Sequence, residues 1–193
     1  MVLYAKAQKL PLDIIVQPAA KRGEAPLAMG YRRGHCLLVL TMRGNPDTET
    51  ALAGVEAGLQ PAVVEAMFAH EIAHCWRHVK GAWQASGSRA GDPAGANGSA
   101  LADARRRMRE AQQEEAYADL VALAWTRERH PVRYAQVHAW LAQYRADQPV
   151  SGGHHDTRAW LDLAADPGVF DRGATLFDRA EPVWRAGLAG GAP

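Results

Sequence analysis

The sequence predicts an α+β fold in which helices dominate and a small β-sheet comes first. Short runs rich in apolar and β-branched residues, at 12–17, 29–32 and 36–42, are separated by turn-forming residues. After them come two long stretches, about 60–80 and 101–129, in which the only glycine or proline is Pro61, at the start of the first. A chain of 193 residues is long enough for one domain with its own core, so we expect a single domain over 1–193.

Each strand is bounded by a recognisable breaker. Residues 12–17 read as a strand that stops at Pro18. The runs 29–32 and 36–42 flank Arg33 and Gly34, which is typical of a hairpin, and a turn cluster follows at 43–47. We expect 36–42 to form an edge strand of this sheet.

The helices are predicted from proline positions and apolar spacing. Pro61 suits the first turn of a helix that runs to about residue 80, and Pro131 ends the helix over 101–129. Further helices are expected at 132–146, 157–163 and 176–188, the last broken at Pro182. The Gly-, Ala- and Ser-rich segment 86–99 between the two long helices is predicted to be a flexible loop.

The composition excludes few classes of function, but it argues against nucleic-acid and membrane partners. Hydrophobic residues make up 48% and charged residues 22%, with a formal net charge of +1. That balance gives no electrostatic reason to expect nucleic acid, and no apolar run is long enough to span a membrane. The N-terminus lacks the apolar core of a signal peptide, so a cytoplasmic location is the default expectation, with leaderless secretion left open.

The two cysteines show no C-x-x-C spacing. In a chain of this size a disulfide scaffold is not expected, and Cys75 is expected simply to pack. A bridge between Cys36 and Cys75 remains an open alternative.

The most informative pattern is H-E-x-x-H at residues 70–74, within an apolar run. Residues four apart share one helix face, so His70 and His74 can direct two imidazoles at one ion. Glu71 is adjacent and can hold a water molecule without being a ligand. This arrangement is typical of a zinc hydrolase, whose catalytic site takes three protein ligands and keeps one position open. His78, one turn further on, is expected to be a polar neighbour.

A second polar pattern lies downstream, where Glu115 and Asp119 are four residues apart on the long helix over 101–129. The combination of H-E-x-x-H with E-x-x-x-D resembles the gluzincins, which include the thermolysin-like zinc peptidases. The stretch 115–119 also resembles the E-x-x-A-D signature of the HtpX-like and CAAX-processing peptidases, which are membrane proteins. The resemblance therefore covers the catalytic helices and not the whole architecture.

The resemblance implies a zincin-like fold and a role for each of these residues. Glu115 would be the third zinc ligand, and Asp119 would orient His70 or His74. The sheet's edge strand would bind substrate peptide by strand addition. If the helix register differed, Glu114 would replace Glu115; Asp119 as the ligand is a further alternative. Two solvated glutamates on an amphipathic helix are the purely structural explanation.

A glycine-containing loop presents His154, His155 and Arg158. It occupies the chain position of an S-x-H-P loop in HtpX-like peptidases, although Asp156 replaces the proline. His155, or His154 in its place, is a candidate donor to the oxyanion of peptide hydrolysis, and Arg158 a candidate partner for a substrate carboxylate. An exposed loop with an Asp helix cap is the structural alternative. A loop histidine could also be the third ligand, as in the SprT-like proteases.

These patterns predict a zinc-dependent metallopeptidase with one Zn²⁺ per chain and a peptide or protein substrate. Glu71 would be the general base for an activated water molecule. The alternative is a non-catalytic or regulatory zinc-binding protein with a closed four-ligand site. Partner proteins, specificity and oligomeric state are not encoded in any pattern we recognise.

Overall fold

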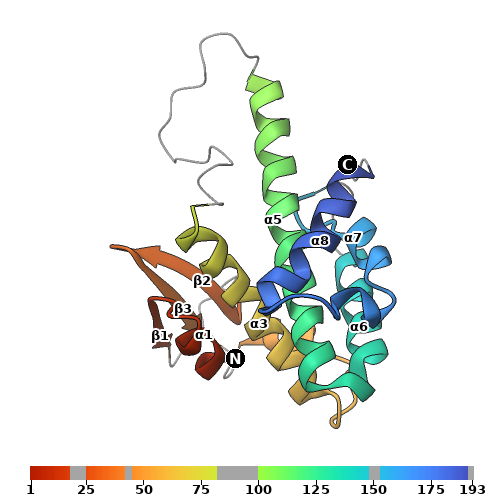
Figure 1. Ribbon diagram of the computed structural model, residues 1–193. Coiled ribbons are helices and arrows are strands. Elements are labelled where there is room, and N and C mark those ends of the chain that lie inside the picture. The colour runs from red at the N-terminus through yellow and green to blue at the C-terminus, as the bar shows by residue number, and fades with distance from the viewer. Residues whose placement is uncertain (18–24, 42–44, 82–99, 148–152, 191–193) are drawn as a thin grey trace.

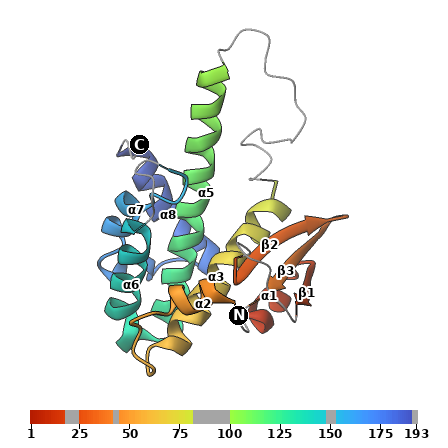
Figure 2. The same ribbon diagram turned by 180° about the vertical axis from the view of Figure 1, so that it is seen from behind.

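A computed structural model describes residues 1–17, 25–41, 45–81, 100–147 and 153–190. A small sheet lies on one side of helix α3 (Gln60–Val79), and helices α6 to α8 lie on the other side, beyond the long helix α5 (Ala100–Arg129), in both views of the molecule (Figures 1 and 2). The expectation of a helix-dominated chain with a small N-terminal sheet is confirmed. The predicted flexible loop at 86–99 lies outside the described residues.

The sheet has three strands in the order β1-β3-β2. Strand β1 (Leu12–Val16) is parallel to β3 (His35–Leu40), and β2 (Leu27–Arg32) is antiparallel to it. Arg33 and Gly34 both have positive φ, which gives the β2–β3 hairpin the turn geometry that matches strand twist. The expectation that residues 36–42 form an edge strand is wrong, because β1 and β2 pair with the two sides of β3 and leave it in the centre.

Two long helices form the middle of the molecule. Helix α3 has Pro61 in its first turn and no other proline or glycine. Helix α5 contains neither residue, so nothing in its sequence interrupts it. The two helices pack against each other, and both contribute fully buried alanines to the core, among them Ala69, Ala73, Ala118 and Ala122. Small side chains let the two backbones approach, so polar side chains that project from both helices can meet.

Shorter helices surround this pair. They are α1 (Val2–Ala7), α2 (Pro46–Ala51), α6 (Tyr134–Ala146), α7 (Arg158–Leu163) and α8 (Leu176–Ala189), with single 3₁₀ turns at Pro131–Arg133 and Pro167–Phe170. Within the described ranges, no helix is long and apolar enough to cross a membrane.

Helix α8 does not break at Pro182, contrary to expectation. Pro182 and Asp178, whose carbonyl loses its helical partner, are both exposed, so water can bind the freed oxygen. Further along, Gly187 lets the indole of Trp160 pack directly on the helix, because a Cβ there would lie only 2.2 Å from Trp160 Nε1. The Trp160 indole N–H donates to the carbonyl oxygen of Trp184 at 3.0 Å.

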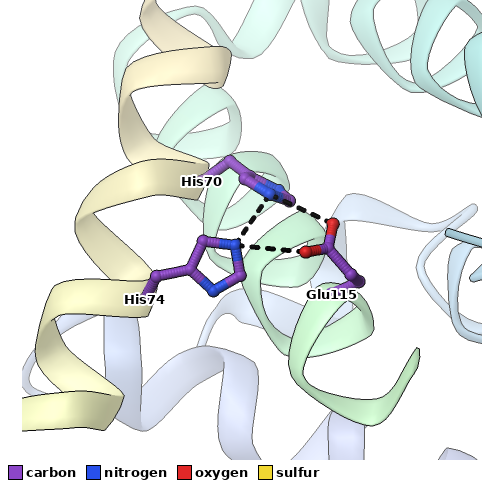
Figure 3. A group of neighbouring side chains, drawn as sticks. All are labelled: His70, His74 and Glu115. Atoms are coloured by element: carbon purple, nitrogen blue, oxygen red, sulfur yellow. Dashed lines mark hydrogen bonds and ion pairs between the residues drawn. The ribbon is translucent and has the colours of Figure 1, made fainter. Parts of the chain in front are cut away.

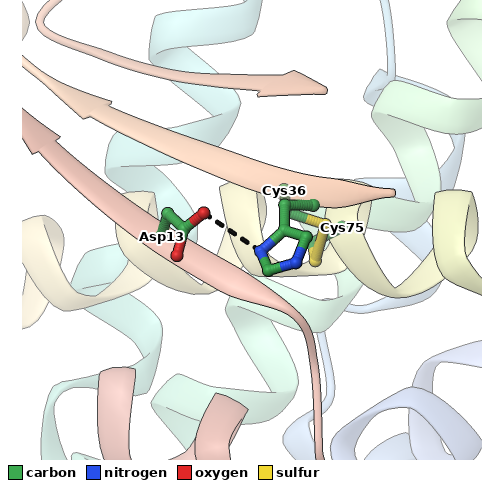
Figure 4. The surroundings of a disulfide bond; sticks show 4 residues. Asp13, Cys36 and Cys75 are labelled. Atoms are coloured by element: carbon green, nitrogen blue, oxygen red, sulfur yellow. Dashed lines mark hydrogen bonds and ion pairs between the residues drawn. A yellow bond between two sulfur atoms is a disulfide. The ribbon is translucent and has the colours of Figure 1, made fainter. Parts of the chain in front are cut away.

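A disulfide bond joins Cys36, at the start of β3, to Cys75 on α3 (Figure 4). Both cysteines are fully buried. The expectation that Cys75 only packs is therefore wrong: the bond ties the centre of the sheet to the helix that carries the H-E-x-x-H motif. Spacing along the chain does not reveal it, since the cysteines lie 39 residues apart and meet only after the sheet docks on α3.

We expect the double substitution Cys36→Ala/Cys75→Ala to lower the free energy of unfolding by roughly 3–4 kcal/mol. A cross-link over this separation removes that much conformational entropy from the unfolded chain. Urea unfolding of wild type and variant measures the difference. Reductant should destabilise only the wild type, and equal stability of the two chains would contradict the prediction.

Candidate metal centre

Helices α3 and α5 bring His70, His74 and Glu115 together (Figure 3). The Nε2 atoms of the two histidines are 3.0 Å apart. Glu115 Oε2 lies 3.4 Å from His70 Nε2, and Glu115 Oε1 lies 3.5 Å from His74 Nε2. Both imidazoles and the carboxylate thus face one point.

This donor set fits zinc. Two imidazole nitrogens and one carboxylate oxygen make up the ligands of many catalytic zinc sites, with bonds of about 2.0–2.2 Å. Ligand atoms at the corners of such a tetrahedron lie about 3.4 Å apart, close to the separations seen here. The three side chains are mostly buried, and three protein ligands leave one position for another group.

Asp119 holds His70 in the required orientation. Its Oδ1 atom lies 2.9 Å from His70 Nδ1, so the other ring nitrogen is the one that faces His74 and Glu115. Asp119 is fully buried, and burial alone would raise its pKa, yet Arg145 and His70 hold that pKa well below its usual range. Thr157 donates a further hydrogen bond to Asp119 Oδ2 at 2.6 Å. With its oxygens already engaged, Asp119 is a supporting residue and not a fourth candidate ligand.

Arg145, near the end of α6, belongs to the same network. Its guanidinium donates to both oxygens of Asp119, at 2.7 and 2.9 Å, and to Glu115 Oε2 at 3.3 Å. Sequence analysis missed this residue because no spacing rule connects it to Glu115 or Asp119. An arginine among the apolar positions of α6 was the available signal, since a buried guanidinium requires a carboxylate partner.

Glu71, the motif residue that is not a candidate ligand, lines a cavity of about 390 Å³ together with the three candidate ligands. Burial raises its pKa, although His70 and His74 oppose the shift. Around the polar residues the cavity wall is mainly apolar, and it comes from β2, α3, α5 and α6: Leu27, Met29, Ala66, Met67, Ala122, Trp140 and Leu141.

The three loop residues that the sequence suggested for the site, His154, His155 and Arg158, lie in different places. His155 lines the cavity, and its Nε2 atom lies 3.7 Å from Glu115 Oε2. His154 is exposed, with its ring centroid 3.9 Å from that of His155, and it is not part of the described cavity wall. Arg158 is exposed and donates hydrogen bonds to Asp156 at 2.8 and 2.9 Å, so the structure does not bring it to the candidate metal centre.

Glu114, the alternative ligand, is committed elsewhere. Its carboxylate accepts two hydrogen bonds from Arg77 of α3, one of them 2.9 Å from Arg77 Nε. The guanidinium lies 4.8 Å from the ring centroid of Tyr117 and 4.5 Å from that of Trp184. This buried pair fixes the position of α5 against α3 one helical turn from the candidate ligands.

Comparisons with family models, with curated proteins and with solved structures find no match for the chain.

We expect the single substitution Glu114→Gln to destabilise the fold by about 3–5 kcal/mol, because it leaves the Arg77 guanidinium buried without its counter-charge. The double variant Arg77→Met/Glu114→Gln should lose less than the sum of the two single changes. Urea unfolding of all four chains measures this coupling. Strictly additive losses would show that the two side chains do not stabilise each other.

Proposed function

We propose that this chain is a zinc-dependent metallopeptidase of the gluzincin type, with a zincin-like arrangement of its two central helices. The observation on which the proposal rests is the convergence of His70, His74 and Glu115, from motifs 41 residues apart, beside a cavity that also contains Glu71. A purely structural zinc site does not need an additional carboxylate there, whereas hydrolysis does.

In this proposal His70, His74 and Glu115 would hold one zinc ion. Bound zinc supplies Lewis-acid chemistry: it polarises the scissile carbonyl and lowers the pKa of a water molecule. Glu71 accepts the proton of the attacking water and passes it to the leaving amine. His155, at the cavity wall, donates a hydrogen bond to the carbonyl oxygen as it gains negative charge. Asp119 and Arg145 keep His70 and Glu115 in place.

The position of His155 also supports two alternatives, in which this loop histidine is itself a zinc ligand. Its ring lies close enough to Glu115 that a modest loop movement could make it a ligand. As a fourth ligand, it would close the site and give a regulatory or structural zinc protein. As a replacement for Glu115, it would give a protease of the SprT-like kind. Metal content of single variants separates these possibilities.

The disulfide bears on where the protein functions. Buried disulfides persist in oxidising compartments and are rare where glutathione and thioredoxin keep thiols reduced. The Cys36–Cys75 bond thus favours an oxidising environment over the cytoplasmic default.

Purified wild-type protein should contain about one zinc per chain by elemental analysis. Glu115→Ala should lose most of it, since a tetrahedral site then lacks one of three protein ligands, and His155→Ala should keep it. Zinc lost only from the His155 variant would favour the loop-ligand alternatives. No zinc in the wild type, even after Zn²⁺ is supplied, would refute the proposal.

Glu71→Gln should retain zinc and lose at least about 100-fold in turnover, because the amide is nearly isosteric but cannot accept the proton. A fluorescence-quenched peptide library, screened first with the wild type, provides the assay. Glu56→Gln is the matched control: it makes the same chemical change at an exposed glutamate that does not line the cavity, and turnover should be unchanged. An unchanged rate in the Glu71 variant would refute the proposed mechanism.

A further inference from the structure

Gln112 of α5 is a buried polar residue that none of the sequence motifs includes. It is 2% exposed, and burial of an amide is unfavourable unless the amide is hydrogen-bonded. The Nε2 atom of Gln112 donates a hydrogen bond to the backbone carbonyl of Asp156 at 2.7 Å. Residues three and seven apart share a helix face, so Gln112 lies on the same face as Glu115 and Asp119. The face of α5 that carries a candidate ligand therefore also binds the loop before α7.

A second side-chain bond fastens the same loop to α5. The hydroxyl of Thr157, which is fully buried, donates to Asp119 Oδ2 at 2.6 Å. Within the loop, the amide of Asp156 donates to the Gly153 carbonyl at 2.9 Å, and the amide of Thr157 donates to the His155 carbonyl at 3.0 Å. The loop is thus closed on itself, and two side-chain bonds hold it to α5 directly after His155.

These two bonds to α5, which we call the loop clamp, determine where the His155 ring lies. His155 Nε2 is 3.7 Å from Glu115 Oε2, close to the spacing of about 3.4 Å between two ligand atoms of a tetrahedral zinc site. In the described part of the chain, however, the ligand atoms that converge on one point come from three residues, and His155 is not one of them. A small displacement of the loop would bring the imidazole into that group.

We propose that the loop clamp keeps the fourth coordination position of the metal open, by holding the His155 imidazole beside the metal and off it. Gln112 and Thr157 are then positioning residues, since neither is a candidate ligand. This inference rests on the proposed peptidase function, which needs that position for water and substrate. Imidazole nitrogen is a good zinc ligand, so a loop released from α5 would let His155 bind the metal and close the site.

The test asks whether the bound metal has a position for an outside ligand. The full-length chain is loaded with Co²⁺, whose visible absorption depends on its ligands, and is titrated with acetohydroxamate, a small chelator that binds through oxygen. The chains compared are the wild type, Gln112→Met, His155→Ala, the double variant Gln112→Met/His155→Ala, and Gln113→Met. Methionine has nearly the length of glutamine but no donor. Gln113→Met is the matched control, because it makes the same change at a half-buried neighbour that points about 100° away around α5.

Gln112→Met should weaken acetohydroxamate binding at least about 10-fold, because apparent affinity falls with the fraction of molecules whose binding position is free. The double variant should bind as tightly as His155→Ala alone, since neither chain has this histidine to occupy the metal. Gln113→Met should bind as the wild type does. Thr157→Val removes the other bond of the clamp and should act as Gln112→Met does, which keeps the test decisive if the Gln112 variant fails to fold. Thr157→Ser keeps the hydroxyl and should behave as the wild type.

Equal acetohydroxamate affinity of the wild type and the clamp variants would overturn this role. So would a weakening that the double variant retains or that Gln113→Met shares, because either result would show a general loosening of the site. In these cases the wild type binds both the metal and acetohydroxamate, so the proposed peptidase function would stand. A wild-type chain that binds Co²⁺ but not acetohydroxamate would favour the closed site and overturn both proposals. A wild-type chain that binds neither Co²⁺ nor Zn²⁺ would overturn the peptidase function, and the clamp's role with it.

Discussion

The close packing of α3 against α5 is the constraint on which the rest of the structure depends. Each helix supplies only part of the candidate metal centre, so the three possible ligands come together only if Glu115 faces His70 and His74 across the helix interface. Buried alanines on both helices make that approach possible, and the Arg77–Glu114 pair determines which residues meet. Because Glu114 is bound to Arg77, Glu115 is directed toward the histidines. A shift of α5 by one residue would bury an unpaired arginine, which strongly disfavours the alternative register.

The remaining elements complete the centre from three directions. The sheet approaches from one side and places β2 along the cavity; the disulfide holds it there through β3. Helix α6 approaches from the other side and supplies Arg145 together with much of the apolar wall. The loop before α7 contributes Thr157 to Asp119 and His155 to the cavity. Most of these contacts join residues far apart in the chain, so the site exists only when the whole domain has folded.

Part of the candidate site and of the fold could be predicted from the spacing of residues along the chain. His70 and His74, like Glu115 and Asp119, are related by four residues on one helix, and helical geometry fixes their common direction before any tertiary contact forms. Strand and helix locations follow from similar short-range rules. Arg145 obeys no such rule, since it reaches Asp119 and Glu115 through the packing of a separate helix. The central position of β3 was missed, and the Cys36–Cys75 bond was left as an open alternative, for the same reason: both depend on which segments dock together.

The buried ionic network has a consequence for selectivity among bound species. Glu71, Glu115 and Asp119 are three carboxylates gathered around a single guanidinium, that of Arg145. In the metal-free chain the carboxylates of Asp119 and Glu115 outweigh the effect of burial and raise the pKa of His70 to about 10, so this imidazole is a second positive charge in the group. A histidine that binds a metal gives up that proton, which leaves two uncompensated negative charges in a poorly solvated place. A divalent cation would balance both charges and a monovalent cation only one, so, if the chain binds zinc as proposed, the metal would enter before any acidic group.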